Sequence, residues 1–486
     1  MSENVLLLMA DQFRGDCLSC AGNDAIDTPN LDELASEGVC FSHAYSEVPS
    51  CVPARSILMT GMNQWHTGVL GMGPGMGKMP DTFLHTLPGE FANAGYHTQG
   101  VGKMHFSPQR ALNGFHNTVI DESGRVEEPG FVSDYRDWFE HNKIGQMGYR
   151  DHAVGWNSWM ARPSHLPEWL HSTNWTVDEA VNFLHRRDPN KPFFLKVSFN
   201  RPHSPYDPPQ VYYDMYRDEE LPAPYIGDWS EMNLDEKEAM KTDAWRGARS
   251  ERDIHRARAA YYGSITHVDH QIGRLFYEMK KMGIYDDTII LFVSDHGDML
   301  GDHYLWRKTY AYEGSAHVPL ILKVPKEQTL PKGAILDQVV GLQDVMPTLL
   351  DAVGLQVPDS CDGASLLPLL RGETRWREYI HGEHCTCYHT DQENHYVTDG
   401  HYKLVWLDNL DIWQFFDLDN DAGELHNCYT DPNYQVQVNR FRNYLFDELT
   451  KRKSPLVNDT GFVAKTTSEN LQSPNYRNYA CKGKER

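Results

Sequence analysis

Residues 288–298, TIILFVSDHGD, join an uninterrupted apolar run to an abrupt series of acidic and polar residues. The run 288–293 is β-branched and aromatic without polar alternation, which is typical of a strand buried on both faces. Such strands belong to parallel sheets that are covered by helices. Asp295 and His296 are therefore expected just beyond the carboxyl end of a central strand.

Other apolar runs on both sides of this segment alternate with helical patterns. The expected strands are residues 5–9, 98–102, 193–199 and 320–324. The expected helices are 28–37, 54–60 after Pro53, and the long amphipathic stretch 259–282. This alternation predicts an α/β fold with a large, mostly parallel sheet that is flanked by helices.

The pattern changes after about residue 370. Short strand-like runs with turn residues between them precede a helical pattern at 434–451, and a polar tail begins at Ser454. We therefore expect a large α/β domain at residues 1–369 and a C-terminal subdomain at 370–486. The subdomain should contain a small antiparallel sheet, one helix and an irregular tail.

Composition limits the possible partners of the chain. Its 486 residues carry a formal net charge of −23, which offers no general attraction to nucleic acid or anionic membranes. No apolar run approaches the roughly 20 residues of a membrane span. The start, MSENVLLLMADQ, lacks the basic segment and cleavage site of a signal peptide, so a cytoplasmic location is expected. No pattern indicates the oligomeric state.

The nine cysteines are odd in number and fit no disulfide framework. Cys17 and Cys20 have no second ligand pair at zinc-finger spacing. For this pair, and for Cys385 with Cys387, we expect reduced structural thiols rather than a zinc or redox site.

Polar residues directly follow several of the expected strands. They are Asp11-Gln12, Lys103 with His105, the segment 200–203, and Asp295-His296. In α/β sheets, ligands bind beyond the carboxyl ends of the strands. An anionic ligand is compatible with the acidic chain, because charges within about 10 Å dominate a screened pocket.

Residues 50–61, SCVPARSILMTG, contain the pattern C-x-P-x-R from Cys51 to Arg55. Alone, this pattern also fits a buried cysteine in front of a helix that starts at Pro53. Together with the strand-end residues it resembles the signature of the type I, formylglycine-dependent sulfatases of the alkaline phosphatase superfamily. The resemblance covers roughly residues 4–450 and implies an alkaline-phosphatase-like fold and the hydrolysis of sulfate esters.

The resemblance implies a particular nucleophile. In this family a formylglycine-generating maturation enzyme oxidises the cysteine, here Cys51, to an aldehyde whose hydrate is a geminal diol. One hydroxyl attacks sulfur and displaces the alcohol, and the second allows the sulfated residue to collapse back to the aldehyde. A serine would lack this means of release. Arg55 would stabilise the attacking oxygen.

The resemblance also implies one divalent cation, for which calcium is the family expectation. Its ligands would be Asp11, Gln12, Cys51, Asp295 and His296. Gln12 and His296 depart from the common family set of three Asp and one Asn, and a His ligand also tolerates zinc or manganese. The Asp-Gln and Asp-His pairs resemble bacterial sulfatases that remove 2-O-sulfate from uronic acids in glycosaminoglycan degradation.

Three further segments resemble parts of the family site. In GYHTQGVGKMH at 95–105, Lys103 would contact a sulfate oxygen and His105 would aid proton release from the diol. In NRPHSP at 200–205, His203 would be the general acid for the leaving alcohol. Lys308 matches the family lysine that binds sulfate, whose oxygens only accept hydrogen bonds. The implied catalytic set is Cys51, Arg55, Lys103, His105, His203 and Lys308, of which Lys103, His203 and Lys308 bind substrate.

The expected substrate is a small-molecule or oligosaccharide sulfate ester, with an unsaturated uronate 2-O-sulfate fragment as the first choice. A substrate carboxylate needs a basic partner outside the sulfate site. Candidates for the pocket are His66, Gln109, Arg110, Arg201, Arg307 and Tyr312, and Trp65, Trp156, Trp159 and Trp175 could stack on a ring or fill the core. Three alternatives remain open: an aryl or steroid sulfatase, a phosphonate monoester or phosphodiester hydrolase, and a non-enzymatic anion-binding protein.

Overall fold

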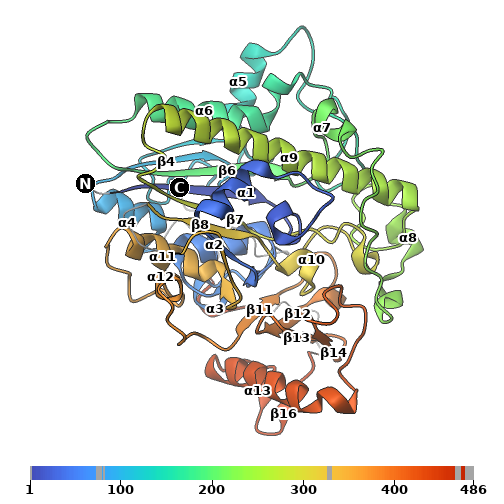
Figure 1. Cartoon of the computed structure of the whole chain (residues 1–486). Coiled ribbons are helices and arrows are strands. Elements are labelled where there is room, and N and C mark those ends of the chain that lie inside the picture. The colour runs from blue at the N-terminus through green and yellow to red at the C-terminus, as the bar shows by residue number, and fades with distance from the viewer. Residues whose placement is uncertain (1–2, 73–78, 80–82, 326–330, 466–471, 477–486) are drawn as a thin grey trace.

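The computed structural model describes residues 3–72, 79, 83–325, 331–465 and 472–476. Its centre is an eight-stranded sheet with the order β5-β4-β6-β1-β7-β8-β2-β9 (Figure 1). These strands are β1 (Asn4–Asp11), β2 (Val39–Phe41), β4 (His97–Gly102), β5 (Asn117–Ile120), β6 (Phe193–Pro202), β7 (Thr288–Ser294), β8 (Leu320–Lys323) and β9 (Ala334–Leu336). Among them only β8 runs against its neighbours, so the predicted α/β fold with a mostly parallel sheet is confirmed.

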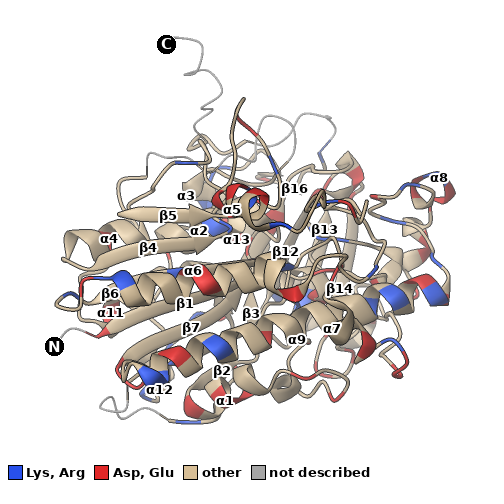
Figure 2. Cartoon of the chain, turned by 90° about the horizontal axis from the view of Figure 1, so that it is seen from above, with Lys and Arg blue, Asp and Glu red and all other residues tan. Residues whose placement is uncertain are grey.

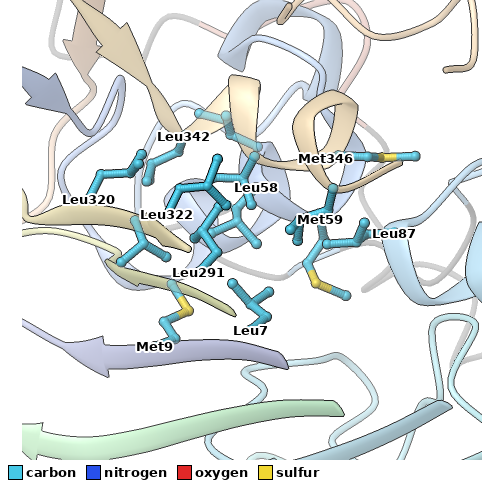
Figure 3. Close-up of a cluster of buried hydrophobic side chains, with 14 of the residues drawn as sticks. Leu7, Met9, Leu58, Met59, Leu87, Leu291, Leu320, Leu322, Leu342 and Met346 are labelled. Carbon is cyan, nitrogen blue, oxygen red and sulfur yellow. The ribbon is translucent and has the colours of Figure 1, made fainter. Parts of the chain in front are cut away.

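Successive side chains of β1 enter two different cores, because neighbouring residues of a strand face opposite sides of the sheet. Val5, Leu7 and Met9 belong to one cluster, part of which Figure 3 shows. This cluster includes side chains of α2 (Cys51–Thr60), α4 (Leu87–Asn93), α11 (Val345–Ala352) and α12 (Leu367–Leu370). Leu6, Leu8 and Ala10 belong to the second cluster, with α1 (Pro29–Glu37), α6 (Ser172–Arg186) and α9 (Glu251–Lys281). Helices therefore cover both faces of the sheet.

Two helices begin earlier than predicted. α2 starts at Cys51 rather than at residue 54, since Pro53 lies in the first turn, where its missing N–H has no helical partner to lose. α9 starts at Glu251 rather than at residue 259, and Ser250 caps it by accepting from the amide of Asp253 at 3.2 Å. Its early turns are rich in charged residues, so they lack the apolar period that predicts a helix. Figure 2 shows acidic and basic residues interspersed along α9.

The C-terminal region contains the predicted antiparallel sheet and helix. The strands β11 (Ile380–His384), β12 (Asn394–Thr398), β13 (Tyr402–Leu407) and β14 (Ile412–Asp417) pair in sequence order. α13 (Gln435–Lys451) packs on this sheet in a separate apolar cluster. A short hairpin, β15 (Val457–Asn458) with β16 (Gly461–Phe462), lies where an irregular tail was predicted, and residues 466–471 and 477–486 of that tail lie outside the described residues. The domain boundary at residue 370 stays a prediction.

The remaining elements are short and lie in the connections. They include β3 (Ala44–Tyr45) paired with β10 (Val340–Gly341), and the helices α3 (Gln64–Thr67), α5 (Asp134–Asn142), α7 (Gln210–Asp214), α8 (Glu236–Ala239) and α10 (Glu313–Ala316). No helix in the described part of the chain is long and apolar enough to cross a membrane. The structure contains no disulfide bond among the eight cysteines that it describes, and Cys481 lies outside the described residues.

A buried ion pair joins the C-terminal sheet to the residues after α13. Arg452 contacts both carboxylate oxygens of Glu383 on β11, with Nη2 2.8 Å from Oε2. Burial raises the pKa of Glu383, but Arg452 and then His395 lower it to about 2. Because this pKa is below the ordinary value of 4.5, the pair stabilises the fold above that pH. The stabilisation is lost as the pH falls from about 4.5 towards 2.

Arg452→Met should leave a buried carboxylate without its partner. We expect the free energy of unfolding at neutral pH to fall by about 3–5 kcal/mol. The difference from wild type should shrink below pH 4.5, where Glu383 takes up a proton in the unfolded chain. Urea unfolding followed by circular dichroism at several pH values measures both effects.

Arg440→Met is the matched control, because Arg440 and Glu378 form an exposed pair at 3.8 Å. This variant should unfold like wild type within about 0.5 kcal/mol. A loss of stability in Arg452→Met that does not change with pH would contradict the electrostatic account.

Candidate active site

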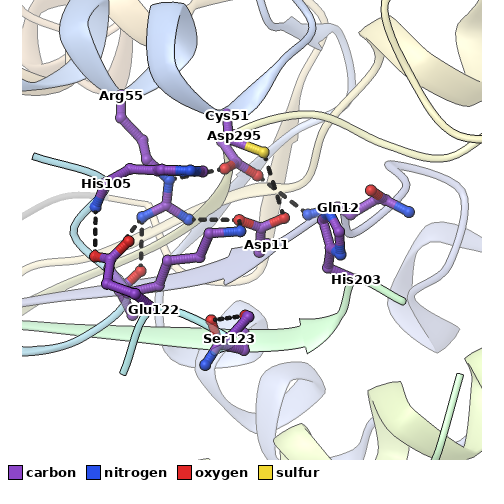
Figure 4. Close-up of polar contacts among 12 residues, drawn as sticks. Asp11, Gln12, Cys51, Arg55, His105, Glu122, Ser123, His203 and Asp295 are labelled. Carbon is purple, nitrogen blue, oxygen red and sulfur yellow. Dashed lines mark hydrogen bonds and ion pairs between the residues drawn. The ribbon is translucent and has the colours of Figure 1, made fainter. Parts of the chain in front are cut away.

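The carboxyl ends of neighbouring strands bring the predicted polar residues together (Figure 4). β1 ends at Asp11, and β7, its parallel neighbour, is followed by Asp295. β6, on the other side of β1, leads to His203, and β4 leads to Lys103. The prediction that these residues meet at one edge of the sheet is therefore supported by the strand order itself.

Arg55 on α2 joins the two acidic residues at this edge. Its Nη2 donates to Oδ2 of Asp11 and its Nε to Oδ2 of Asp295, each at 2.9 Å, and all three side chains are fully buried. Its Nη1 donates to the carbonyl oxygen of Lys103 at 2.7 Å and to Oγ of Ser198 at 2.9 Å. The guanidinium thus holds the Oδ2 atoms of both carboxylates.

The other carboxylate oxygens face His296 and Cys51. Nε2 of His296 lies 3.9 Å from Oδ1 of Asp11, 3.8 Å from Oδ1 of Asp295 and 3.2 Å from Sγ of Cys51. Nδ1 of His296 donates to the carbonyl oxygen of Gly297 at 2.8 Å, so Nε2 is the ring nitrogen that faces the two carboxylates and residue 51.

One donor atom from each of Asp11, Cys51, Asp295 and His296 lies within 4.8 Å of the others. Two carboxylate oxygens, an imidazole nitrogen and the side chain of residue 51 form a donor set that fits a divalent cation. Four of the five predicted ligands are therefore in one cluster.

Gln12, the fifth predicted ligand, lies beside this cluster, but its side chain has other partners. Its Nε2 donates to Oδ2 of Asp298, and its Oε1 accepts from Nζ of Lys308 at 2.8 Å. Its backbone amide donates to Oδ1 of Asp295 at 3.1 Å. In this arrangement Gln12 connects the carboxylates to Lys308, and its role as a ligand stays a prediction.

Lys308 and His203 form a hydrogen-bonded pair. Nζ of Lys308 lies 2.6 Å from Nε2 of His203, while Nδ1 of His203 donates to the carbonyl oxygen of Ser204 at 2.7 Å. Burial, followed by the charge of Lys308, lowers the pKa of His203 well below its usual value. The imidazole is therefore neutral and accepts a hydrogen bond from the ammonium group.

Lys103 and His105 approach the cluster from the residues after β4. Nζ of Lys103 lies 2.7 Å from Oδ2 of Asp11. The backbone amide of His105 donates to Oε1 of Glu122 at 2.9 Å, and its φ of 64° places it in the left-handed region. Nδ1 of His105 is buried and has no hydrogen-bond partner among the described residues.

Position 51 lies at the first residue of α2 and is 2% exposed. Burial and Asp11 raise the pKa of the Cys51 thiol, but Lys308, Lys103 and His296 together lower it to about 7. A helix N-terminus also favours negative charge. The surroundings of residue 51 therefore favour a negative charge on its side chain.

A cavity of about 270 Å³ opens at this site, lined by Cys51, Lys103, His105, His203 and Lys308 among others. A larger cavity of about 560 Å³ lies between α3 and the C-terminal region. None of the predicted catalytic residues lines the larger cavity, so the chemistry of the walls, rather than volume, identifies the site.

Of the residues considered for contacts beyond the sulfate, Arg307 and Trp156 line the 270 Å³ cavity. The others have different environments. His66 and Arg110 each pair with an aspartate near the surface, and Arg201 forms an ion pair with buried Asp207. Gln109 forms hydrogen bonds with residues 125–128, and the hydroxyl of Tyr312 donates to the side chain of Gln414. Trp65 and Trp159 lie under arginine side chains, and Trp175 belongs to a small core cluster.

Sequence reasoning did not single out three further residues of the site. Asp298 accepts from Gln12 and from the backbone amide of Arg307, and it lies in the same SDHGD run as Asp295, which could have indicated it. Glu122 follows β5, whose sequence NTVI begins with two polar residues and lacks the apolar run that predicts a buried strand. Tyr388 comes from the C-terminal region, and no local pattern points to it.

Comparison with known proteins agrees with this geometry. The Sulfatase family model matches residues 3–355, and a model for the C-terminal part of N-sulphoglucosamine sulphohydrolase matches residues 301–451. An arylsulfatase of Clostridium perfringens (strain 13 / Type A) is 43% identical over 468 residues, which are 93% of this chain and 95% of that protein. A choline-sulfatase of Rhizobium meliloti (strain 1021) is 30% identical, over 89% of this chain and 83% of that protein.

A solved structure also shares the fold over nearly the whole chain. The phosphonate monoester hydrolase of Agrobacterium radiobacter superposes with a TM-score of 0.77 at 25% identity, over 95% of this chain and 99% of that one. The Sulfatase family model covers well over half of the chain, and it includes residues 50–61 and both acidic strand ends. The chain belongs to the sulfatase family and is a sulfuric ester hydrolase.

Proposed function

We propose that this sulfatase acts through formylglycine at position 51, with one divalent cation, and that it removes sulfate from a carboxylate-bearing sugar of the uronate 2-O-sulfate class. The observation that carries the proposal is the arrangement around Arg55. This side chain binds Oδ2 of Asp11 and of Asp295, while both Oδ1 atoms face His296 next to residue 51. Calcium is the first candidate for the cation.

Each polar residue of the site has a role in this proposal. Lys103 and Lys308 bind sulfate oxygens, because ammonium groups only donate and sulfate oxygens only accept. Arg55 stabilises the oxygen of the nucleophile and positions the two carboxylates. A cation held by the cluster would supply positive charge that favours attack on an anionic ester.

His203 and Lys308 together deliver the proton to the leaving alcohol. In the structure Nε2 of His203 accepts from Lys308, so the proton between these two groups is on the ammonium group. Transfer along this hydrogen bond lets His203 act as the general acid. The unpartnered Nδ1 of His105 is available to accept a proton from the hydrated residue 51.

The substrate class rests on two features. Gln12 and His296 resemble the ligands of uronate 2-O-sulfatases, and Arg307 adds a cation to the cavity. An aryl sulfate is the alternative substrate, and the 43% identical arylsulfatase supports it. Aryl sulfates are suitable assay substrates whether the natural substrate is a sugar sulfate or an aryl sulfate.

Formylglycine at residue 51 is tested by mass spectrometry of the matured protein. The peptide that contains residue 51 should show the mass loss that results from replacing CH₂SH by CHO. Because Cys51 is 2% exposed, the modification must precede complete folding. Cys385 provides an internal control, since a buried structural thiol should keep its mass. Full sulfatase activity in protein with unmodified Cys51 would contradict the mechanism.

A phosphonate monoester or phosphodiester hydrolase is the second candidate, favoured by the TM-score of 0.77 with the phosphonate monoester hydrolase. Turnover of a sulfate monoester and a phosphodiester of the same alcohol should be measured in parallel on one preparation. We expect kcat/KM for the sulfate ester to be the larger. An equal or larger value for the phosphodiester would overturn the choice of sulfate.

His203→Ala should damage esters of poor leaving groups most, because only these need the proton in the transition state. We expect kcat for an alkyl sugar sulfate to fall by about 100-fold or more, and kcat for nitrophenyl sulfate to fall far less. His66→Ala, which changes an exposed histidine paired with Asp362, is the matched control. Equal losses on both esters in His203→Ala would remove the general-acid role.

A further inference from the structure

The cavity beside residue 51 contains two arginines in addition to the lysines of the sulfate site. Arg125 and Arg307 both line it, together with the aromatic side chains of Trp156 and Tyr388. The two guanidinium groups differ in their partners, and this difference shows which of them is free to bind an anion.

Arg125 is neutralised by neighbouring carboxylates. Its Nη2 lies 2.5 Å from Oε2 of Glu122, and its Nη1 lies 3.3 Å from Oε1 of Glu127. A guanidinium already paired with two carboxylates has little remaining attraction for an anionic ligand. Arg125 therefore serves mainly to hold the loop after β5.

Arg307 has no such partner. Among the residues that the structure describes, no Asp or Glu carboxylate lies within ion-pairing distance of its guanidinium. Nη1 donates only to the carbonyl oxygen of Asp243, at 3.2 Å, and Nε is buried without a hydrogen-bond partner in the described part of the chain. A largely buried cation without a counterion is costly unless a ligand supplies the negative charge.

The surrounding structure fixes where Arg307 can point. Its guanidinium lies 4.3 Å from the ring centroid of Tyr388, which gives a cation–π contact. Its backbone amide donates to Oδ1 of Asp298 at 3.0 Å, its carbonyl oxygen accepts from Met299 at 2.7 Å, and its φ is 71°. These two backbone hydrogen bonds hold Arg307 in the left-handed region, a conformation that costs energy for a residue with a side chain.

Tyr388 adds a second unpartnered group at the same place. Tyr388 lines the cavity, and its hydroxyl is buried and has no hydrogen-bond partner among the described residues. Lys308, the residue after Arg307, reaches the sulfate site, so one short segment presents both a sulfate-binding ammonium and the unpaired guanidinium.

We propose that Arg307, assisted by the Tyr388 hydroxyl, binds a carboxylate on the alcohol part of the sulfate ester. The planar fork of a guanidinium matches a carboxylate in two parallel hydrogen bonds. The inference rests on the proposed sulfatase function and defines its substrate class: the alcohol that leaves carries its own negative charge. Esters of cationic alcohols should be poor substrates, because Arg307 repels them.

The test compares two aryl esters that differ in one charge. The sulfate esters of 4-hydroxybenzoate and of its methyl ester, together with the corresponding 3-hydroxy pair, are assayed with matured enzyme, and kcat/KM is measured for each. We expect the carboxylate ester to be preferred in at least one pair. In Arg307→Met the ratio of carboxylate to methyl ester should fall by about 10- to 100-fold, mainly through KM.

Two more variants complete the design. Tyr388→Phe removes only the hydroxyl and should lower the same ratio by about 3- to 10-fold, which keeps the test valid if Arg307→Met folds poorly. Arg110→Met removes an arginine that is paired with Asp134 outside the cavity, and its ratio should equal that of wild type.

Equal turnover of charged and neutral esters by the wild type would overturn the carboxylate site while leaving the sulfatase function intact. If Arg307→Met lowers kcat/KM equally for both esters, so that their ratio is unchanged, the carboxylate site is likewise overturned and the sulfatase function is not. Failure of matured wild type on every sulfate ester would instead contradict the proposed function itself. Choline sulfate gives an additional comparison, since a rate above that of the carboxylate ester would contradict the proposed charge preference.

Discussion

The buried contact between Arg55 and two carboxylates organises the whole site. Asp11 and Asp295 end neighbouring parallel strands, and without a cation between them their charges would repel in a medium that excludes water. Arg55 extends from α2, the helix that begins with residue 51. One interaction therefore fixes the separation of the carboxylates, turns their Oδ1 atoms towards His296, and positions the start of the helix above them.

Much of this arrangement could be predicted from the sequence, because it follows from topology. Once residues 288–293 are identified as a central parallel strand, Asp11, Lys103, His203 and Asp295 must lie near the same edge. The rest depends on tertiary packing. Tyr388 reaches the cavity from the C-terminal region. The side chain of Gln12 forms hydrogen bonds with Asp298 and Lys308. No local sequence pattern indicates either arrangement. The early starts of α2 and α9 were missed because a proline or charged residues occupy their first turns.

The acidic chain and the anionic substrate are compatible because the relevant charges are local. The formal net charge of −23 is spread over the molecule, whereas Lys103, Lys308 and Arg307 line one cavity. Asp11 and Asp295, the two carboxylates nearest to residue 51, each form an ion pair with Arg55 through Oδ2. They therefore repel an anion in the cavity less strongly. Arg125, by contrast, is paired with Glu122 and Glu127 and adds little positive potential.

The most direct test of this account is a crystal structure of the matured protein with calcium, with the ion located by anomalous scattering. One ion should contact Oδ1 of Asp11, Oδ1 of Asp295, Nε2 of His296 and residue 51. Arg55 should still bind the Oδ2 atoms of both carboxylates. An ion that displaces Arg55, or the absence of any ion from this cluster at saturating calcium, would contradict it.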